Sequence, residues 1–129
     1  PEDSAGSVMS PEYVALREGA RVSDAMTRLR RLALVGRNVS YVYVTDDEGR
    51  LVGVLLMRDI VLAGPHRRLR EIMIRNVFRV YASDDLDAVA DVLMEKRLLA
   101  VPVVDDGERL VGVVNATQLV SELQEEGFE

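Results

Sequence analysis

The chain contains no cysteine and no tryptophan, and aromatic residues make up only 5% of its 129 residues. Without cysteine it can form no disulfide, no thiolate metal site and no cysteine nucleophile, which fits a reducing compartment. It also lacks long apolar segments. The longest runs, residues 51–57 and 98–104, are far shorter than the roughly 20 residues of a membrane-spanning helix. We therefore expect a soluble unit without thiol chemistry.

Basic residues are in the minority, with 16 Lys and Arg against 22 Asp and Glu and a net charge of −6. This charge would repel the phosphates of a nucleic acid unless a basic stripe were kept apart from the acids. The richest basic stretch, residues 66–70, is followed at once by Glu71 and is interpreted as a solvated linker. It holds the single histidine, His66, around which no nucleophile and base pair can be assembled. We therefore expect no nucleic-acid partner and no catalysis, so the protein is not an enzyme.

What is present is a globular composition, with 48% apolar residues in a chain long enough for one compact domain or two small ones that share a core. The sequence begins with Pro1 and not with Met, so we expect it to be a fragment of a longer polypeptide.

An internal repeat organises the chain. The segment YVTDDEGRLVGV at residues 43–54 returns as PVVDDGERLVGV at 102–113, a shift of 59 positions. Upstream, Val8 and Met9 correspond to Ile72 and Met73 at a shift of 64. Apolar residues with helical spacing match at the same shift: Val22, Ala25, Met26 and Leu29 with Leu86, Val89, Ala90 and Leu93. The first copy therefore has five extra residues, which we place in a loop near residues 35–38.

Each copy predicts the order β-α-β-β-α. An extended piece (residues 14–16 and 78–81) precedes the amphipathic helix, and Asp85 is a predicted N-cap of the second such helix. Two strands joined by an acidic, glycine-containing turn follow, and then a closing helix (57–63 and 116–126). We expect an α/β fold of two repeats, residues 1–66 and 67–129, separated near Gly64-Pro65 and packed about a pseudo-twofold axis.

Two runs resemble a known family. VPVVDDGERLVGVV at residues 101–114 and GVLLMRD at 53–59 resemble the tandem cystathionine β-synthase (CBS) domain pair, or Bateman module. A narrower resemblance is to the cytosolic CBS region of MgtE-type magnesium transporters. It is carried by VMSPEYVALREG at residues 8–19 and by RDIV at 58–61 followed by Pro65.

The resemblance implies a regulatory module on the cytoplasmic side of the cell membrane. In such transporters the module forms a homodimer between an N-terminal helical domain and a transmembrane pore domain of the same polypeptide. It senses Mg²⁺ and controls the gating of the pore. ATP or another adenine nucleotide is the second ligand that the resemblance implies.

The resemblance also implies a nucleotide site. CBS pairs that bind adenine nucleotides have a G-h-h-T/S-x-x-D pattern, in which the Asp carboxylate accepts hydrogen bonds from the ribose hydroxyls. Here that Asp is Asp59, Arg58 could meet a phosphate, Tyr41 could stack on the base and Pro102 could line the wall. The pattern is incomplete, because Leu56, Asn115 and Gln118 replace its other polar positions. The alternatives are strand packing for Tyr41 and Tyr43 and a helix-start cap for Asp59.

Magnesium ligands are expected among the acids. Mg²⁺ takes oxygen ligands and is usually held by one or two carboxylates and its own water. Asp84, Asp85 and Asp87 crowd one helix start, and the resemblance places Asp85 and Asp87 at metal-contacting positions, with Glu125 and Glu126 as further candidates. Family acids are missing at Arg97, Gln118, Ser121 and Gln124. The alternative is that Asp85 caps the helix and Asp87 favours its dipole. We interpret the acids of residues 46–48 and 105–108 as turn formers.

Two other functions stay open at the level of sequence. One is an adenine-nucleotide-sensing CBS domain that regulates a metabolic enzyme or a soluble protein. The other is a dimerising domain whose ligand sites have been lost, which the residues Leu56, Asn115 and Gln118 favour.

Overall fold

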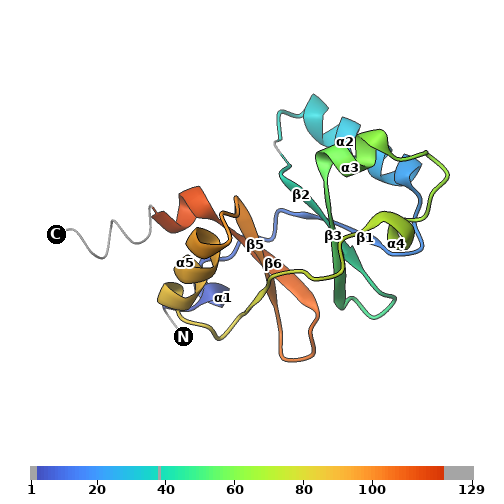
Figure 1. The fold of residues 1–129 in the computed structure, drawn as a ribbon. Coiled ribbons are helices and arrows are strands. Elements are labelled where there is room, and N and C mark those ends of the chain that lie inside the picture. Colours follow the sequence, from blue (N-terminus) through green and yellow to red (C-terminus); the bar gives the residue numbers. More distant parts are fainter. Residues whose placement is uncertain (1–2, 38, 121–129) are drawn as a thin grey trace. The chain divides into compact units, whose positions relative to one another are not determined.

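The computed structural model describes residues 3–37 and 39–120, which form two three-stranded sheets with helices (Figure 1). The chain divides into two compact units. Unit 1 comprises Pro1–Glu12 and Phe78–Glu129, and unit 2 comprises Tyr13–Val77. In the described residues no helix is both long and apolar enough to cross a lipid bilayer.

Unit 2 contains the sheet β1-β2-β3. Strand β1 runs parallel to β2, and β2 forms an antiparallel hairpin with β3. Alternate residues of β2, Val42 and Val44, join a core with the apolar side of α2 and with Ile60 of α3. The elements are β1 (Val14–Arg17), α2 (Val22–Leu34), β2 (Tyr41–Thr45), β3 (Leu51–Leu56), α3 (Met57–Leu62) and α4 (Leu69–Ile72).

Unit 1 repeats this arrangement with the sheet β4-β5-β6. Strand β4 is parallel to β5, and β5 is antiparallel to β6. Val101 and Val103 of β5 pack in a core with Leu86, Val89 and Leu93 of α5. The elements are α1 (Ala5–Val8), β4 (Val80–Tyr81), α5 (Leu86–Glu95), β5 (Ala100–Val104) and β6 (Leu110–Asn115).

The two compact units do not follow the order of the sequence repeats. In unit 1, Ser10 forms an antiparallel bridge with Val113 of β6, and in unit 2, Ile74 forms the equivalent bridge with Val54 of β3. The segment that opens each repeat therefore completes the sheet edge of the other repeat's hairpin. The division into repeats 1–66 and 67–129 stays a prediction. The compact units differ from these repeats because each unit contains the opening segment of the other repeat.

A glycine in each hairpin makes room for the exchanged segment. A Cβ on Gly53 would lie 2.4 Å from the sulfur of Met73, and a Cβ on Gly112 would lie 2.6 Å from the sulfur of Met9. Such distances are too short for any side chain. Glycine at these positions therefore lets the methionine pack directly on the strand backbone.

The α/β fold and the order β-α-β-β-α are confirmed, with some boundaries shifted. The strand predicted at 78–81 is only Val80–Tyr81, and the first closing helix ends at Leu62. Residues 116–120 are helical, and the rest of the predicted helix 116–126 lies outside the described residues. The pattern missed the four-residue helices α1 and α4, because one turn is too short to show a helical period.

The interpretation of residues 66–70 as a solvated linker is correct for the side chains of His66, Arg67 and Arg70, which are exposed, but the segment is not a free linker. The carbonyl of Arg67 accepts a hydrogen bond from the amide of Val22 (2.9 Å), and the guanidinium of Arg68 donates to the carbonyl of Gly19 (2.7 Å). Leu69, which begins α4, is fully buried. The sequence did not predict that Leu69 is buried, because Arg67, Arg68 and Arg70 surround it.

Candidate functional site

Three of the predicted nucleotide residues lie at one end of the unit 2 sheet. Tyr41 is the first residue of β2 and pairs with Leu56, the last residue of β3. Helix α3 begins immediately afterwards, so Arg58 and Asp59 stand in its first turn. The hairpin register therefore brings Tyr41, Arg58 and Asp59 to the same end of the sheet.

Asp59 already has one structural role. Its Oδ2 accepts a hydrogen bond from the amide of Leu56 at 3.0 Å, which satisfies a donor at the start of α3. The predicted alternative, a helix-start cap, is therefore confirmed. A carboxylate has about four acceptor positions, so this bond leaves capacity for ribose hydroxyls. Arg58, next to it, is exposed and can reach an anionic group.

Pro102 belongs to the other compact unit. It lies inside β5, opposite Val113, and is buried. The end of this sheet that corresponds to Tyr41 and Leu56 carries Ala100 opposite Asn115, without an aromatic ring. The role of Pro102 in a nucleotide site stays a prediction, and unit 1 by itself offers a poorer site.

Tyr43 shares the sheet face of Tyr41, because side chains alternate along a strand. The two rings lie 6.2 Å apart between centroids, at an angle of 51°. Tyr43 is 3% exposed, and burial raises the pKa of its hydroxyl. That hydroxyl has no hydrogen-bond partner among residues 3–37 and 39–120. The buried ring of Tyr43 agrees with the predicted alternative of strand packing. Strand packing does not explain why its buried hydroxyl has no partner among the described residues.

The predicted metal residues at the start of α5 are also used by the backbone. Asp85 is the N-cap, as predicted, and its Oδ1 accepts a hydrogen bond from the amide of Ala88 at 2.8 Å. Asp84 accepts one from the amide of Tyr81 at 2.8 Å. Asp87 is exposed in the first turn, where a negative charge favours the helix dipole.

The described part of the chain contains no group of three or more His, Cys, Asp or Glu side chains that could hold a metal ion. Glu125 and Glu126 lie outside the described residues. A hydrated Mg²⁺ needs only one or two carboxylates, so Asp85 and Asp87 fit a site that is completed by other acids. Their metal role stays a prediction.

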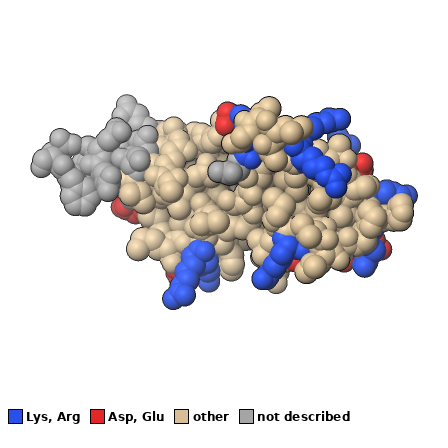
Figure 2. Space-filling view, turned by 90° about the horizontal axis from the view of Figure 1, so that it is seen from above, with Lys and Arg blue, Asp and Glu red and all other residues tan. Residues whose placement is uncertain are grey.

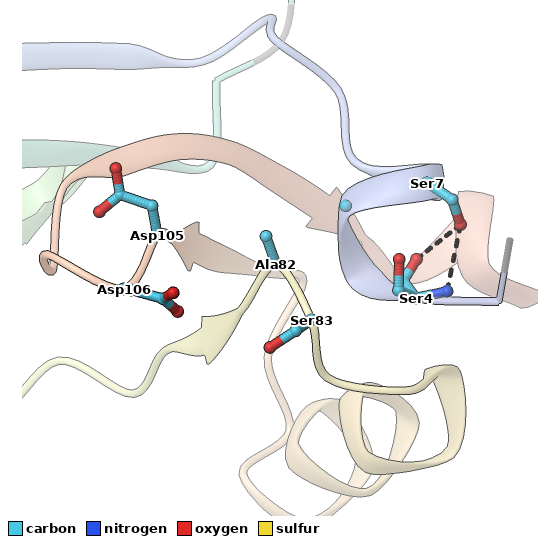
Figure 3. Close-up of a pocket in the computed structure, with 7 residues that line it drawn as sticks. Ser4, Ser7, Ala82, Ser83, Asp105 and Asp106 are labelled. Atoms are coloured by element: carbon cyan, nitrogen blue, oxygen red, sulfur yellow. Dashed lines mark hydrogen bonds between the residues drawn. The ribbon is translucent and has the colours of Figure 1, made fainter. Parts of the chain in front are cut away.

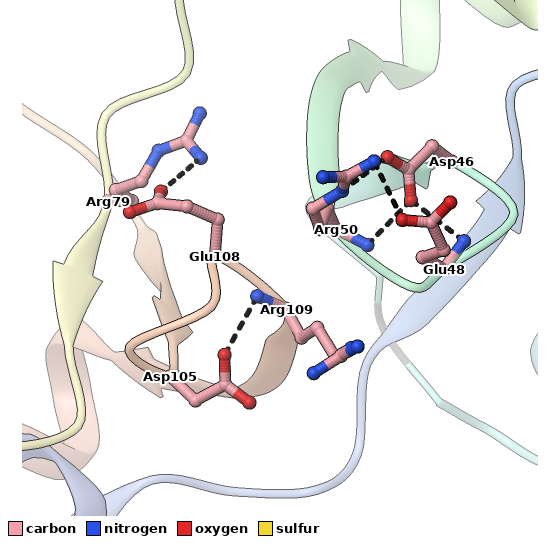
Figure 4. A network of polar contacts seen from close by, with 7 residues as sticks. All are labelled: Asp46, Glu48, Arg50, Arg79, Asp105, Glu108 and Arg109. Atoms are coloured by element: carbon pink, nitrogen blue, oxygen red, sulfur yellow. Dashed lines mark hydrogen bonds and ion pairs between the residues drawn. The ribbon is translucent and has the colours of Figure 1, made fainter.

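The acidic turns form hydrogen bonds within themselves, as predicted (Figure 4). In the β2–β3 turn, Oδ1 of Asp46 accepts hydrogen bonds from the amides of Glu48 and Arg50, both at 2.9 Å. The hydrogen bonds that Arg50 donates to Asp46 hold the pKa of Asp46 below its usual value. In the β5–β6 turn, Asp105 accepts from the amides of Gly107 (2.9 Å) and Arg109 (3.0 Å).

The two turns carry their glycine and glutamate in the opposite order. Gly49 has a φ of 84° in the first turn, whereas Glu108 has a φ of 68° in the second. The carboxylate of Glu108 accepts hydrogen bonds from Arg79 at 3.1 Å and from the hydroxyl of Tyr81. The bond to Glu108 raises the pKa of Tyr81. The sequence contains the signal for this difference, because DDEGR in the first turn becomes DDGER in the second.

An open pocket of about 460 Å³ lies within unit 1, and the sequence did not predict it (Figure 3). The acids of the β5–β6 turn stand on one side and the serines of α1 on the other. Ser7 Oγ donates to the carbonyl of Ser4 at 2.7 Å and accepts from the amide of Ser4 at 3.2 Å, so the Ser7 hydroxyl stabilises the helix start. The lining residues are Ser4, Gly6, Ser7, Ala82, Ser83, Asp105 and Asp106.

Basic side chains stand at several separate places between uncharged surface (Figure 2). In the stretch at residues 66–70, Arg67 pairs with Glu71 at 3.3 Å. Local acids therefore neutralise part of the positive charge that the sequence shows there.

Comparison with known proteins gives one family. The sequence model of the CBS domain matches residues 5–66 and 69–125. The magnesium transporter MgtE of Thermus thermophilus is 41% identical over 128 residues, which is 99% of this chain and 28% of the transporter. The magnesium transporter MgtE of Bacillus subtilis is 33% identical over 129 residues, 100% of this chain and 29% of the transporter.

Among solved structures, the cytosolic domain of the Mg²⁺ channel MgtE in complex with ATP superposes with a TM-score of 0.88 at 41% identity. The match covers 95% of this chain and 50% of that domain. The chain thus spans less than a third of the two curated relatives and half of the solved cytosolic domain.

Proposed function

This chain belongs to the CBS domain family, as a tandem pair of such domains, and from that membership we propose that it is the regulatory module of a magnesium transporter of the MgtE type. The observation that carries the proposal is the identity of 41% along 99% of the chain with the Thermus thermophilus transporter. The module has no catalytic role in this proposal. Its repeats comprise residues 1–66 and 67–129.

The proposed module acts as a homodimer at the cytoplasmic side of the membrane, joined to an N-terminal helical domain and a transmembrane pore domain. Mg²⁺ binds between acidic surfaces and removes their mutual repulsion, which favours the dimer arrangement of the closed pore. A ligand shifts such an equilibrium only by its preference for one arrangement. A change from 1:99 to 99:1 needs a preference of about 10⁴-fold, which several weak sites together can supply.

Asp85 and Asp87 are the proposed magnesium contacts of unit 1, with Glu125 and Glu126 as further acids. Both side chains are exposed, and Asp87 is the better candidate on geometry because it has no capping role. Asp85 still has its Oδ2 available for a water of the hydrated ion, since its cap uses Oδ1.

ATP, or another adenine nucleotide, is the proposed second ligand, as in the related MgtE structure with ATP. Tyr41 stacks on the base, Asp59 accepts hydrogen bonds from the ribose and Arg58 pairs with phosphate. Pro102 is the fourth residue proposed for nucleotide binding. The position of Tyr41, Arg58 and Asp59 at the same end of the unit 2 sheet supports this arrangement.

One thermal-shift titration tests both ligands, because a ligand that binds only the folded state stabilises it by RT ln(1 + [L]/Kd), about 2.7 kcal/mol at 100 times Kd. We expect a saturable rise of the unfolding midpoint with millimolar Mg²⁺ and a smaller one with Ca²⁺. Asp85→Asn with Asp87→Asn should reduce it, while the cap survives because Asn is an equally good N-cap. Asp47→Asn with Asp91→Asn is the control with the same charge change.

In the nucleotide arm, ATP, AMP and S-adenosylmethionine are titrated separately. Asp59→Asn should abolish the ATP shift. Asp24→Asn is the matched control, because Asp24 accepts a hydrogen bond from the amide of Arg21 (2.9 Å) at the same position of α2. A nucleotide shift without any Mg²⁺ shift would favour a regulator of a metabolic enzyme instead. Absence of both shifts would contradict the proposal.

A further inference from the structure

The hydroxyl of Tyr43 is the buried polar group that the site described so far does not use. Its side chain is 3% exposed, and its oxygen has no hydrogen-bond partner within residues 3–37 and 39–120. Nearly all buried hydroxyls are bonded to protein or water, because an unpaired one retains the full cost of leaving water. Burial raises the pKa of Tyr43, so the hydroxyl stays protonated and able to donate at neutral pH.

The position of this hydroxyl connects it to the nucleotide residues. Val42 and Val44 point into the core under α2 and α3, so Tyr41 and Tyr43 lie on the opposite face of the sheet. The 6.2 Å between their ring centroids is the separation of neighbouring aromatic groups in contact. A planar base stacked on Tyr41 would therefore lie on the sheet face that also carries Tyr43.

The second repeat lacks this pair. At the equivalent positions, 59 residues later, stand Ala100 and Pro102, which have neither ring stacking of this kind nor a hydroxyl. The tyrosine pair is therefore a feature of the first repeat and is absent at the matching positions of the second.

We propose that the Tyr43 hydroxyl donates a hydrogen bond to a ring nitrogen of a purine base that is stacked on Tyr41, and so determines specificity at this site. The inference rests on the proposed nucleotide function. Because the hydroxyl is covered in the ligand-free structure, the base reaches it only when packing on this face changes. The new bond then stabilises the rearranged state over the free state, which couples nucleotide binding to conformation.

Tyr43→Phe tests the proposal, with ATP as the probe in isothermal titration calorimetry. The variant should raise the Kd for ATP about tenfold, which equals about 1.4 kcal/mol. In the absence of ATP its unfolding midpoint should stay the same or rise, because removal of an unpaired buried hydroxyl is neutral or stabilising.

Tyr81→Phe is the matched control. It removes a hydroxyl that does have a partner, since Tyr81 donates to Glu108 in unit 1. This variant should lower the unfolding midpoint and leave the Kd for ATP unchanged. The two variants should therefore differ in both measurements: only Tyr43→Phe weakens ATP binding, and only Tyr81→Phe lowers the unfolding midpoint.

Three results would overturn the inference. Wild-type affinity for ATP in Tyr43→Phe would refute the contact and leave the proposed nucleotide function intact. A lowered midpoint of ligand-free Tyr43→Phe would show that the hydroxyl has a partner in the free protein. Failure of the unaltered protein to bind ATP would remove the proposed nucleotide function, and this inference with it.

Discussion

Glu108 stands at a backbone position that most residues avoid. Its φ of 68° lies in the left-handed region, where a side chain costs about 1–2 kcal/mol relative to glycine. The first hairpin places Gly49 at the matching position, with a φ of 84°. In the second hairpin the carboxylate of Glu108 meets Arg79 and Tyr81, and these contacts offset the strain.

Because of this strain, glycine at position 108 should destabilise the protein less than alanine, the reverse of the usual order. Glu108→Gly and Glu108→Ala lose the same contacts, but only Ala keeps the strained backbone. We expect Glu108→Gly to be more stable than Glu108→Ala by about 1 kcal/mol in urea unfolding. At Gly107, whose φ is not positive and whose Cβ would meet its nearest neighbour at 3.4 Å, Gly→Ala should be nearly neutral. Equal stability of the two variants at residue 108 would contradict the argument.

At the scale of elements, an isolated β-bridge and a methionine side chain cover the outer strand of each hairpin, β3 in unit 2 and β6 in unit 1. In unit 2 the amide of Val54 donates to the carbonyl of Ile74 at 3.0 Å, and that of Ile74 donates back at 2.9 Å. Met73 covers Gly53. The edges of β3 and β6 are thus partly paired, which reduces the backbone groups open to another strand.

Gly53→Ala should therefore cost about 1–3 kcal/mol, the usual range for overpacking. The added Cβ would meet the Cγ of Met73 at 2.7 Å as well as its sulfur. In the double variant with Met73→Ala the loss should be smaller than the sum of the single losses, because the clash disappears. Gly64→Ala is the control, since a Cβ there meets its nearest neighbour only at 3.7 Å. Additive losses in thermal unfolding would show that the two residues are independent.

At the scale of the molecule, the opening segment of the chain belongs to unit 1. Ala5 and Val8 are in the unit 1 core, and Ser10 exchanges two backbone hydrogen bonds with Val113, at 2.7 and 3.0 Å. Removal of residues 1–10 should therefore destabilise the second repeat and not the first.

Hydrogen exchange measures this directly. After the deletion, the amide of Val113, which donates to Ser10, should exchange faster. The amide of Val54, which donates to Ile74 in unit 2, should exchange at its former rate and serves as the internal control. Faster exchange at Val54 with protection kept at Val113 would contradict the assignment of the segment to unit 1.

The structural roles of several acidic residues could be predicted, because the signals for caps and turns are local in sequence. Asp85 before an amphipathic run predicts an N-cap, and its bond to Ala88 confirms this. Asp46 and Asp105 in glycine-containing turns predict hydrogen bonds to nearby amides, which are present. The Tyr43 hydroxyl was missed, because a lack of hydrogen-bond partners depends on every residue that packs around it.

The sequence by itself determined the α/β class, the twofold repeat and the order of strands and helices, because these depend on periodicity and turn residues within short stretches. It also carried the resemblance to the CBS family. Only the tertiary structure decided that Met9 packs on Gly112 and Met73 on Gly53, so that each opening segment joins the other repeat's sheet. That choice depends on which distant surfaces bury the most apolar area together, and no local pattern records it.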